Sequence, residues 1–421
     1  MNSELKKIRI SGAKNSATRL LAASLISDET STFYNFPTEL VDANHKKRFI
    51  ENMGGVVEFD SEKETATINA TRLEDRLLED YDYPIRTTYL LVPGLIKRTG
   101  VAKIPYPGGC KIGNRGYDLH VMVWEKMGAS VEEKENHIEV KANRLEGAEI
   151  NFPITTIGGT ETALICGSIA KGVTTVRNAY ISPEVFDLIR YLRAVGVEID
   201  VVGNSFIKIR GSEYHRGTSH KVLPDRIEAI TWMIFAAISG IPMLIEDVPF
   251  KSMEIPLTHL QEAGIDYFSN QTSVMISEES VRNGIQPFEL ATGTHPGVIS
   301  DMQPFYVLLG LKADGISRIH DYRYPERVRY LEELSKSLEG GLEWKSGEIV
   351  TTGKLSFKPA QMNSTDLRGS MAVLIAALLA GNTGESRVEN IQMALRGYNK
   401  LEEKLRVLGF TFRLEGNTMI V

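Results

Sequence analysis

A single unit of about 70 residues recurs six times along this chain, and the repetition constrains the fold more than any other feature. Every copy holds a helix that ends in a small-residue glycine turn and is followed by two short strands; the turn glycines are Gly54, Gly128, Gly196, Gly264, Gly340 and Gly409. An earlier helix in each copy, rich in Ala, Leu and Ile, leads into a strand that ends near Asn or Asp. The expected unit is strand, buried helix, strand, exposed helix and two strands, an α/β pattern written βαβαββ.

The two helices of the unit differ in their polar faces. The first is apolar almost all round, as in residues 369–381, which predicts a helix enclosed by its domain. The second carries charges on one face, as in residues 183–192 and 398–408, which predicts a helix at the surface. Six units in 421 residues therefore predict two domains of three repeats each, with the polar stretch 210–225 as the joint.

The composition excludes several classes of protein. Lys and Arg number 48 against 54 Asp and Glu, a net charge of −6, so a surface that attracts nucleic acid or an anionic membrane has no support. Cys110 and Cys166 are the only cysteines, too few for a disulfide framework, and the opening residues MNSELKKIRISGAKN lack the apolar region of a signal peptide. We therefore expect a cytoplasmic protein. No P-loop, dinucleotide-binding or zinc motif occurs, so no cofactor and no metal are expected.

The starts of the buried helices carry opposite charges in the two halves of the chain. Lys14-Asn15, Arg86-Thr87-Thr88 and Gly158-Gly159-Thr160 mark the starts in the first half, whereas Asp225, Asp301 and Asp366 mark those in the second. Each Asp is explained by itself as an N-cap. The asymmetry nevertheless suggests a cleft that binds an anion on one side, at helix N-termini, and abstracts a proton on the other.

The loop at residues 106–115, YPGGCKIGNR, is the second candidate site. Its glycines expose Cys110, and Lys111 and Arg115 would stabilise a thiolate, which is the environment of a reactive cysteine. A structural turn that happens to contain a cysteine is the alternative. Cys166, inside an apolar helix, is interpreted as a small buried side chain.

Nearly end to end, the chain resembles the enolpyruvyl transferases. The matching motifs are ISGAKNS at 10–16, GGCKIGNR at 108–115, VLPDRIE at 222–228, THPGVISDMQ at 294–303, STDLRGS at 364–370 and RGYNKLEEKL at 396–405. The shikimate-pathway branch of the family lacks the cysteine loop, so Cys110 favours the amino-sugar branch. The resemblance implies a two-domain inside-out α/β barrel with three repeats per domain and an active site in the interdomain cleft. The implied domains are 14–223, with the cysteine loop, and 1–13 together with 224–421.

The resemblance also implies a reaction: transfer of the enolpyruvyl group of phosphoenolpyruvate to the 3-hydroxyl of UDP-N-acetylglucosamine, with release of phosphate. Cys110 matches the general acid, Asp301 the group that takes the hydroxyl proton, and Asn15 the group that orients the hydroxyl. The remaining matches fall into three sets: Lys14, Arg115 and Arg396 around the phosphate, Arg327 and Arg368 around the carboxylate, and Arg86, Asp225 and Asp366 completing the closed cleft.

Two departures from the family pattern concern the nucleotide of the acceptor. The family usually has Arg-Pro-x-Asp-Leu where the segment lines the uracil, and this chain has Arg115, Gly116, Tyr117, Asp118 and Leu119. The resemblance implies that Asp118, Leu119, Ile157 and Gly158 bind substrate. The family usually also has a lysine shortly before the third buried helix, which reaches the diphosphate of the acceptor; here the position is Ile154, and residues 151–158 contain no Lys or Arg. A paralogue that acts on another nucleotide or nucleotide sugar, such as UMP, is therefore the alternative.

Two interpretations from other classes are weaker. An RNA 3′-terminal phosphate cyclase would share similar repeats, but it needs a nucleophilic histidine and a basic surface, and neither is evident at a net charge of −6. A non-catalytic binding paralogue would have no reason to keep Cys110, Asp301, Lys14 and Arg396 together. The expected partners are therefore small-molecule substrates, with neither nucleic acid nor membrane.

Overall fold

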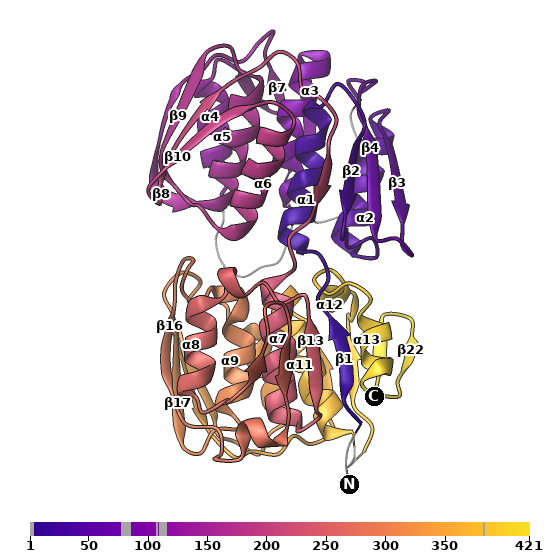
Figure 1. Cartoon of the computed structure of the whole chain (residues 1–421), viewed down its shortest axis with the longest axis vertical. Helices are drawn as coiled ribbons and strands as arrows, with labels where there is room; N and C mark the ends of the chain where they lie inside the picture. The colour runs from indigo at the N-terminus through magenta and orange to yellow at the C-terminus, as the bar shows by residue number, and fades with distance from the viewer. Residues whose placement is uncertain (1–3, 77–85, 107, 109–115, 382–383) are drawn as a thin grey trace. The chain divides into compact units, whose positions relative to one another are not determined.

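The chain forms two compact units in a computed structural model, which describes residues 4–76, 86–106, 108, 116–381 and 384–421 (Figure 1). The N-terminal unit lies between Gly12 and Leu223. The C-terminal unit comprises Pro224–Val421 together with the residues up to Ser11. The chain therefore passes from one unit to the other at residues 11–12 and again at 223–224.

The N-terminal unit contains three repeats. The first comprises α1 (Lys14–Ala23), η1 (Ser24–Ile26), β2 (Ser31–Tyr34), α2 (Val41–Asn52), β3 (Val56–Asp60) and β4 (Thr65–Asn69). The second comprises η2 (Thr87–Leu91), α3 (Val92–Thr99), β5 (Val101–Pro105), α4 (Asp118–Lys126), β6 (Ser130–Glu133) and β7 (His137–Lys141). The third comprises β8 (Glu149–Thr156), α5 (Ile157–Ile169), β9 (Val173–Ala179), α6 (Pro183–Ala194), β10 (Glu198–Val202) and β11 (Phe206–Arg210), and is followed by β12 (Ser219–Lys221).

The C-terminal unit contains three more. The fourth repeat comprises β1 (Lys6–Arg9), α7 (Arg226–Ser239), β13 (Met243–Glu246), η3 (Phe250–Ser252), α8 (Glu254–Glu262), β14 (Phe268–Ser269) and β15 (Val274–Ile276), and η4 (Glu278–Val281) follows it. The fifth comprises β16 (Glu289–Thr292), η5 (Ser300–Met302), α9 (Gln303–Gly310), β17 (Ile316–Asp321), α10 (Arg329–Ser335), β18 (Leu342–Lys345) and β19 (Glu348–Thr352). The sixth comprises β20 (Gln361–Asn363), α11 (Leu367–Ala380), β21 (Arg387–Glu389), α12 (Gln392–Leu395), α13 (Leu401–Val407), β22 (Arg413–Glu415) and β23 (Thr418–Ile420).

Each repeat builds one sheet, and the sheets share one strand order. In the four-stranded sheets an edge strand pairs in parallel with the strand that follows the buried helix; this edge strand is the first of its repeat, except in the sheet of the first repeat, where it is β12. The fourth strand then lies antiparallel between the second and the third. The second repeat shows only β5, β7 and β6 among the described residues. The predicted βαβαββ unit is confirmed.

The six turn glycines adopt a backbone conformation that other residues avoid. Their φ angles are 90° at Gly54, 90° at Gly128, 110° at Gly196, 81° at Gly264, 105° at Gly340 and 92° at Gly409. A residue with a Cβ is strained in that region, whereas glycine reverses the chain there at little cost. The repetition visible in the sequence is thus the repetition of one backbone turn at the end of each exposed helix.

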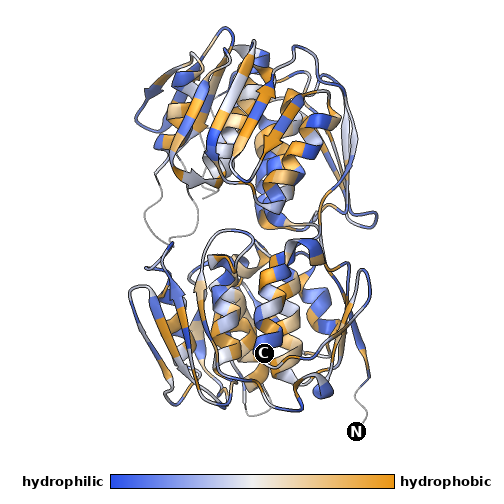
Figure 2. Ribbon diagram, turned by 60° about the vertical axis from the view of Figure 1, so that its left-hand side comes forward, coloured by the Kyte–Doolittle hydropathy of each residue, from blue (hydrophilic) through white to orange (hydrophobic). Residues whose placement is uncertain are grey.

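Apolar residues gather on the first helix of each repeat. Every residue of α9 is buried, whereas α10 of the same repeat buries only Tyr330, Leu331 and Leu334. Figure 2 shows the apolar residues concentrated on the inner helices of each unit and alternating with polar ones along the strands. The sheets therefore form the outside and the helices the inside of each unit, as the predicted inside-out barrel requires. No described helix has the length and apolar character needed to cross a membrane.

Two sheets are completed by segments from far along the chain. β12 pairs with β2, with His220 opposite Phe33, and β1 pairs with β13, with Ile8 opposite Ile245. The polar stretch 210–225, which the sequence suggests as a joint, therefore includes a strand of the N-terminal unit. The crossings between the units are short because a sheet strand ends just before each of them.

Candidate functional site

Two of the three predicted aspartates cap the buried helices of the C-terminal unit. Asp225 Oδ1 accepts hydrogen bonds from the backbone N–H groups of Ile227 and Glu228, at 2.8 and 3.2 Å, at the start of α7. Asp366 Oδ1 accepts from the backbone N–H groups of Arg368 and Gly369, both at 3.1 Å, at the start of α11. The N-cap interpretation holds for both side chains.

Asp301 is different, because it lies within η5 and the N-cap of that helix is Ile299. Its Oδ1 accepts a hydrogen bond from Arg327 Nη1 at 2.9 Å. Arg327 Nη2 donates to Asp366 Oδ1 at 2.7 Å, so one guanidinium joins two of the helix starts. The two carboxylates raise the pKa of Arg327 above its ordinary value, although burial by itself would lower it.

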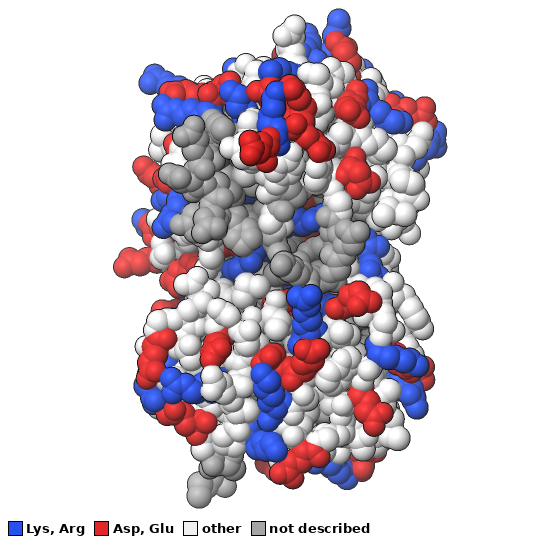
Figure 3. Space-filling view, turned by 180° about the vertical axis from the view of Figure 1, so that it is seen from behind, with Lys and Arg blue, Asp and Glu red and all other residues white. Residues whose placement is uncertain are grey.

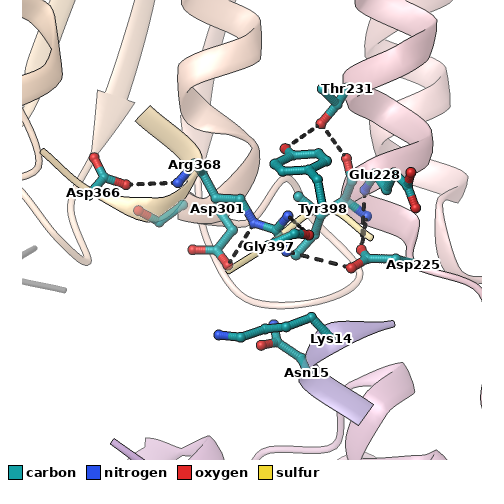
Figure 4. A network of polar contacts seen from close by, with 12 residues as sticks. Lys14, Asn15, Asp225, Glu228, Thr231, Asp301, Asp366, Arg368, Gly397 and Tyr398 are labelled. Carbon is teal, nitrogen blue, oxygen red and sulfur yellow. Dashed lines mark hydrogen bonds and ion pairs between the residues drawn. The ribbon is translucent and has the colours of Figure 1, made fainter. Parts of the chain in front are cut away.

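A second buried guanidinium joins the third helix start to this cluster. Arg368 Nη2 lies 3.6 Å from Asp225 Oδ2, and its Nε lies 3.8 Å from Asp301 Oδ2 (Figure 4). Nη1 donates to the carbonyl of Gly397 at 3.1 Å, and the guanidinium stacks over the ring of Tyr398 at 5.0 Å. Three aspartates and two arginines from three repeats therefore form one cluster at the helix starts.

Accessibility separates Asp301 from the rest of the cluster. The side chain of Asp301 is 32% exposed, whereas those of Asp225, Asp366, Arg327 and Arg368 are between 1% and 6% exposed. Nε of Arg327 and both Nε and Nη2 of Arg368 are buried and have no hydrogen-bond partner among the described residues. Buried N–H groups normally have acceptors, so these three donors retain the capacity to bind an anion, although Nε and Nη2 of Arg368 already lie within 4 Å of aspartate oxygens.

The predicted cation of the N-terminal unit is paired in the same way. Lys14 is the first residue of α1, where the N-cap Ala13 provides no side-chain cap. Its Nζ lies 3.1 Å from Asp42 Oδ2 of α2. A cation at a helix N-terminus is disfavoured by the helix dipole, and the buried carboxylate of Asp42 offsets that cost.

Arg86 precedes η2, the start of the second buried helix, and reaches the segment that departs from the family pattern. Its Nη2 donates to the carbonyl of Gly116 at 2.7 Å. Asp118 and Leu119 then open α4. The next residue, His120, is buried. Its burial, and to a smaller extent the positive charge of Arg86, lowers its pKa to about 3. His120 Nδ1 pairs with the hydroxyl of Thr162 of α5 at 2.7 Å, which ties this segment to the third buried helix.

The third helix start carries no charge. Thr156 caps α5 by accepting from the backbone N–H of Gly159 at 3.2 Å, and Ile157 and Gly158 form the first helical positions. An added Cβ at Gly158 would lie 2.9 Å from the His120 ring, so only glycine fits there. Ile154, at the end of β8, is 63% exposed. An apolar side chain this accessible is consistent with a position that holds a lysine in the family.

Four further predicted residues differ in how far the structure describes them. Arg396 is the C-cap of α12, is 8% exposed, and places Nη1 3.7 Å from the sulfur of Met393. Cys110 and Arg115 lie outside the described residues. Cys166 is fully buried in α5, and burial raises the pKa of its thiol, as expected of an inert cysteine.

The charge asymmetry expected from the helix starts is largely compensated within each unit. The three aspartates are accompanied by Arg327 and Arg368, and Lys14 is accompanied by Asp42. On the face drawn in Figure 3, Lys and Arg side chains are interspersed with Asp and Glu in both units. Lys14 and the three aspartates therefore each have a counter-charge within their own unit, whereas the charges expected at the helix starts are those that the sequence carries.

Several charged residues of the N-terminal unit were not predicted from the sequence. Asp42 pairs with Lys14, and Arg19 of α1 pairs with the buried Glu161 of α5 at 2.9 Å. A signal existed for the second pair: Arg19 and Glu161 are charged residues in the middle of α1 and α5, where the adjoining residues are apolar or small. Charged residues that a helix buries need a partner, so an Arg and a Glu of this kind predict each other.

Comparisons with known proteins cover almost the whole chain. The profile of the family described as EPSP synthase (3-phosphoshikimate 1-carboxyvinyltransferase) matches residues 3–405. The UDP-N-acetylglucosamine 1-carboxyvinyltransferase of Methylocella silvestris is 37% identical over 94% of this chain and 94% of its own length. UDP-N-acetylglucosamine 1-carboxyvinyltransferase 1 of Carboxydothermus hydrogenoformans is 34% identical over 96% of this chain and 94% of its own.

Solved structures agree on the fold. The enolpyruvyl transferase NikO from Streptomyces tendae superposes with a TM-score of 0.85 at 25% identity, covering 97% of this chain and 95% of its own. An EPSP synthase from Acinetobacter baumannii gives a TM-score of 0.74 at 16% identity, with 100% of this chain and 98% of its own covered.

Proposed function

Because this chain belongs to the EPSP synthase family of carboxyvinyltransferases, we propose that it transfers the enolpyruvyl group of phosphoenolpyruvate to the 3-hydroxyl of UDP-N-acetylglucosamine and releases phosphate. Relatives with that name are 34% and 37% identical to this chain over nearly its full length. The reaction would be the first committed step of peptidoglycan precursor synthesis, carried out in the cytoplasm.

The proposed chemistry has two stages. The acceptor hydroxyl oxygen bonds to C2 of phosphoenolpyruvate while the hydroxyl loses its proton to Asp301 and C3 gains a proton from Cys110. The C–O bond to the phosphate then breaks and its electron pair leaves with the phosphate, while C3 returns a proton to the Cys110 thiolate. The phosphate takes up the proton held by Asp301, so both side chains are restored and the enol ether remains on the acceptor. Lys14, Arg115 and Arg396 bind the phosphate, and Arg327 and Arg368 bind the carboxylate, because a trianionic substrate needs several cations around it.

The observation that carries this proposal is the cluster around Asp301. An accessible carboxylate lies between two buried guanidinium groups that still have unsatisfied N–H donors. The donors suit the carboxylate of phosphoenolpyruvate, and the neighbouring Asp301 carboxylate suits removal of a proton from the attacking hydroxyl. Asp225 and Asp366 serve mainly to cap the helices and to hold the two arginines.

A second acceptor has a specific observation in its favour. Ile154 is 63% exposed where the family has a lysine, and residues 151–158 bring no other cation there. A charge-assisted contact to a diphosphate, worth about 1.5–3 kcal/mol, would be absent. A uridine nucleotide with fewer phosphates, such as UMP, is therefore the alternative acceptor for the same transfer.

Phosphate release from phosphoenolpyruvate, measured with each acceptor separately, tests both proposals. Turnover with UDP-N-acetylglucosamine supports the first. Turnover with UMP and none with the nucleotide sugar supports the second. Absence of phosphate release with every uridine nucleotide contradicts enolpyruvyl transfer by this chain.

The phosphonate epoxide fosfomycin provides a test of Cys110. We expect the epoxide to alkylate Cys110, because neighbouring cations stabilise its thiolate, and to leave the buried Cys166 unmodified. Cys110→Ser should abolish the adduct and impair turnover, while Cys166→Ser should leave labelling intact. Mass spectrometry that finds the adduct on Cys166, or finds none in an enzyme that turns over, removes Cys110 from the catalytic group.

A further inference from the structure

The N-terminal unit holds a buried ion pair that the proposed chemistry does not use. Arg19 of α1 donates through Nε to Glu161 Oε1 of α5 at 2.9 Å, and the two side chains are 13% and 2% exposed. The pair joins two buried helices of different repeats. A buried pair of this kind often contributes little net stability, since the desolvation of both charges opposes their attraction, so its presence calls for another explanation.

The contacts of Nη1 of this arginine point to that explanation. Arg19 Nη1 lies 3.3 Å from Asn15 Oδ1, one helical turn earlier on α1, and 3.1 Å from the hydroxyl of Thr18. Glu161 thus orients the guanidinium, and the guanidinium binds the oxygen of the Asn15 amide. A side-chain amide has one acceptor end and one donor end, so fixing Oδ1 also fixes the direction of the NH₂ group.

We propose that Arg19, anchored by Glu161, is a positioning residue that holds the Asn15 amide so that its NH₂ group is the end offered to the acceptor substrate. The inference rests on the proposed function, in which Asn15 orients the acceptor hydroxyl. Asn15 then donates a hydrogen bond to an oxygen of the acceptor rather than accepting one. The chemical class that this arrangement selects is a hydroxyl or other oxygen acceptor of hydrogen bonds.

Lysine cannot replace arginine in this role. Arg19 uses Nε for Glu161 and Nη1 for Asn15, two donors held in one plane. A lysine ammonium at residue 19 reaches Glu161 as a single point charge but does not fix the amide at the same time. Arg19→Lys therefore separates the two roles: it keeps the positive charge that pairs with Glu161 but removes the second donor that positions the Asn15 amide.

The activity test compares Arg19→Met, Arg19→Lys and Asn15→Ala with the double variant Asn15→Ala/Arg19→Met. We expect Arg19→Met and Arg19→Lys to lower kcat/KM for the acceptor about tenfold, with less than a twofold change in KM for phosphoenolpyruvate. In the Asn15→Ala background, Arg19→Met should lower kcat/KM less than twofold further, because the two residues act as one unit. An equal loss in both backgrounds, or full activity of Arg19→Lys, overturns the proposal.

A matched control separates positioning from general loosening of the unit. Arg98 is 11% exposed, donates to Asp28 at 2.6 Å and to the carbonyl of Ser27, and lies outside the proposed site. Arg98→Met should lower the melting temperature while leaving kcat/KM for the acceptor within twofold of the original. A tenfold loss of kcat/KM in Arg98→Met as well would show that disrupting any ion pair in this unit lowers activity, and it would contradict a specific positioning role of Arg19. If Arg19→Met fails to fold because Glu161 loses its ion-pair partner, the double variant Arg19→Leu/Glu161→Val, which removes both charges, is used in its place.

A second readout needs no turnover. In protein labelled with ¹⁵N at asparagine, the side-chain NH₂ signals of Asn15, assigned by their loss in Asn15→Ala, should report a rigid amide. Arg19→Met should turn them into signals of a mobile one, whereas Arg98→Met should not. An Asn15 amide that is equally rigid without Arg19 overturns the inference, whatever the activity. Absence of phosphate release by the unaltered protein with every acceptor overturns the proposed function instead, so the two failures are distinguishable.

Discussion

Two buried helices of the C-terminal unit, α7 and α11, start differently from α1 of the N-terminal unit, although all three belong to the same kind of repeat. In the C-terminal unit the starts at α7 and α11 are capped by Asp225 and Asp366, and buried arginines gather around these carboxylates. In the N-terminal unit α1 starts at Lys14 without a side-chain cap, and the counter-charge of Asp42 comes from α2.

The difference shows that the repeats share one backbone arrangement, while the side chains at the helix starts differ and can serve different functions. An aspartate cap accepts hydrogen bonds from the backbone N–H groups of its own helix, and the same carboxylate can also bind a guanidinium. At a start without a side-chain cap, such as that of α1, the backbone N–H groups and the lysine ammonium are available to bind an anion. The four predictions below test this contrast, beginning with the one that we expect to have the largest effect.

Asp301→Asn should lower kcat about 10²–10⁴-fold, because Asp301 is the accessible carboxylate of its cluster and the amide cannot accept the hydroxyl proton. Folding should be retained, since Arg327 keeps its hydrogen bond to Asp366. Asp225→Asn is the matched comparison: asparagine also caps helices, so we expect no more than about a tenfold loss. Initial rates and thermal melts of both variants provide the measurement, and equal losses of kcat would contradict the distinction between base and cap.

Lys14→Met should lower turnover about a hundredfold and raise the KM for phosphoenolpyruvate, because it removes a cation from the uncapped start of α1. Asp42→Asn removes the partner carboxylate and keeps the ammonium, so we expect a loss of about tenfold or less. Rates of phosphate release against phosphoenolpyruvate concentration distinguish the two variants. A larger loss in Asp42→Asn than in Lys14→Met would mean that the pair serves the fold rather than the substrate.

Asp28 should make the stability of the N-terminal unit depend on pH in the acid range. Burial by itself would raise the pKa of Asp28, but hydrogen bonds from Lys97, Arg98 and the backbone of His215 lower it to about 2. Because the folded-state pKa lies below the unfolded one, the stabilisation is complete above about pH 4 and is lost as the pH falls towards 2. In the C-terminal unit burial raises the pKa of Asp225, so that group shows the opposite dependence.

Asp28→Asn should therefore reduce the free energy of unfolding by about 1–2 kcal/mol at neutral pH and by little near pH 2. Urea unfolding of the variant and the unaltered protein at pH 7, 4 and 2.5 provides the measurement. A difference that is the same at all three pH values would show that the effect comes from lost packing rather than from the ionised carboxylate.

The sequence predicted those parts of the molecule that depend on local backbone preference. The six turn glycines are recognisable because their positive φ angles exclude other residues, and Asp225 and Asp366 are recognisable as caps because capping involves only the next turn of helix. The strand that precedes the second crossing between the units was harder to predict. β12, inside the polar stretch 210–225, pairs with β2 nearly 190 residues earlier, and three polar or charged residues in a row give no signal of a strand.

The pairing of the site residues was not predictable for a related reason. Asp42 and Lys14 lie on separate helices, and the link from Arg327 to both Asp301 and Asp366 joins two repeats. Contacts of this kind depend on how helices pack and not on spacing along the chain. The roles of Cys110 and Arg115, which lie outside the described residues, remain predictions from the resemblance.

The smallest expected effect concerns the helix start that carries no charge. Ile154 precedes α5, its side chain is 63% exposed, and Lys14 and Arg86 already supply cations at the other two starts of the same unit. Ile154→Lys should therefore fold normally and tighten binding of UDP-N-acetylglucosamine about tenfold, through one charge-assisted contact to the diphosphate. Ile154→Gln, which is also polar but uncharged, should change the affinity less than twofold.

Titration calorimetry at two salt concentrations checks the cause, because the gain in affinity from an ionic contact at an exposed position should shrink as the salt concentration rises. A tenfold gain in the glutamine variant, or no gain in the lysine variant, would show that residue 154 does not face the diphosphate, and the contrast between charged and uncharged helix starts would then carry no information about the acceptor.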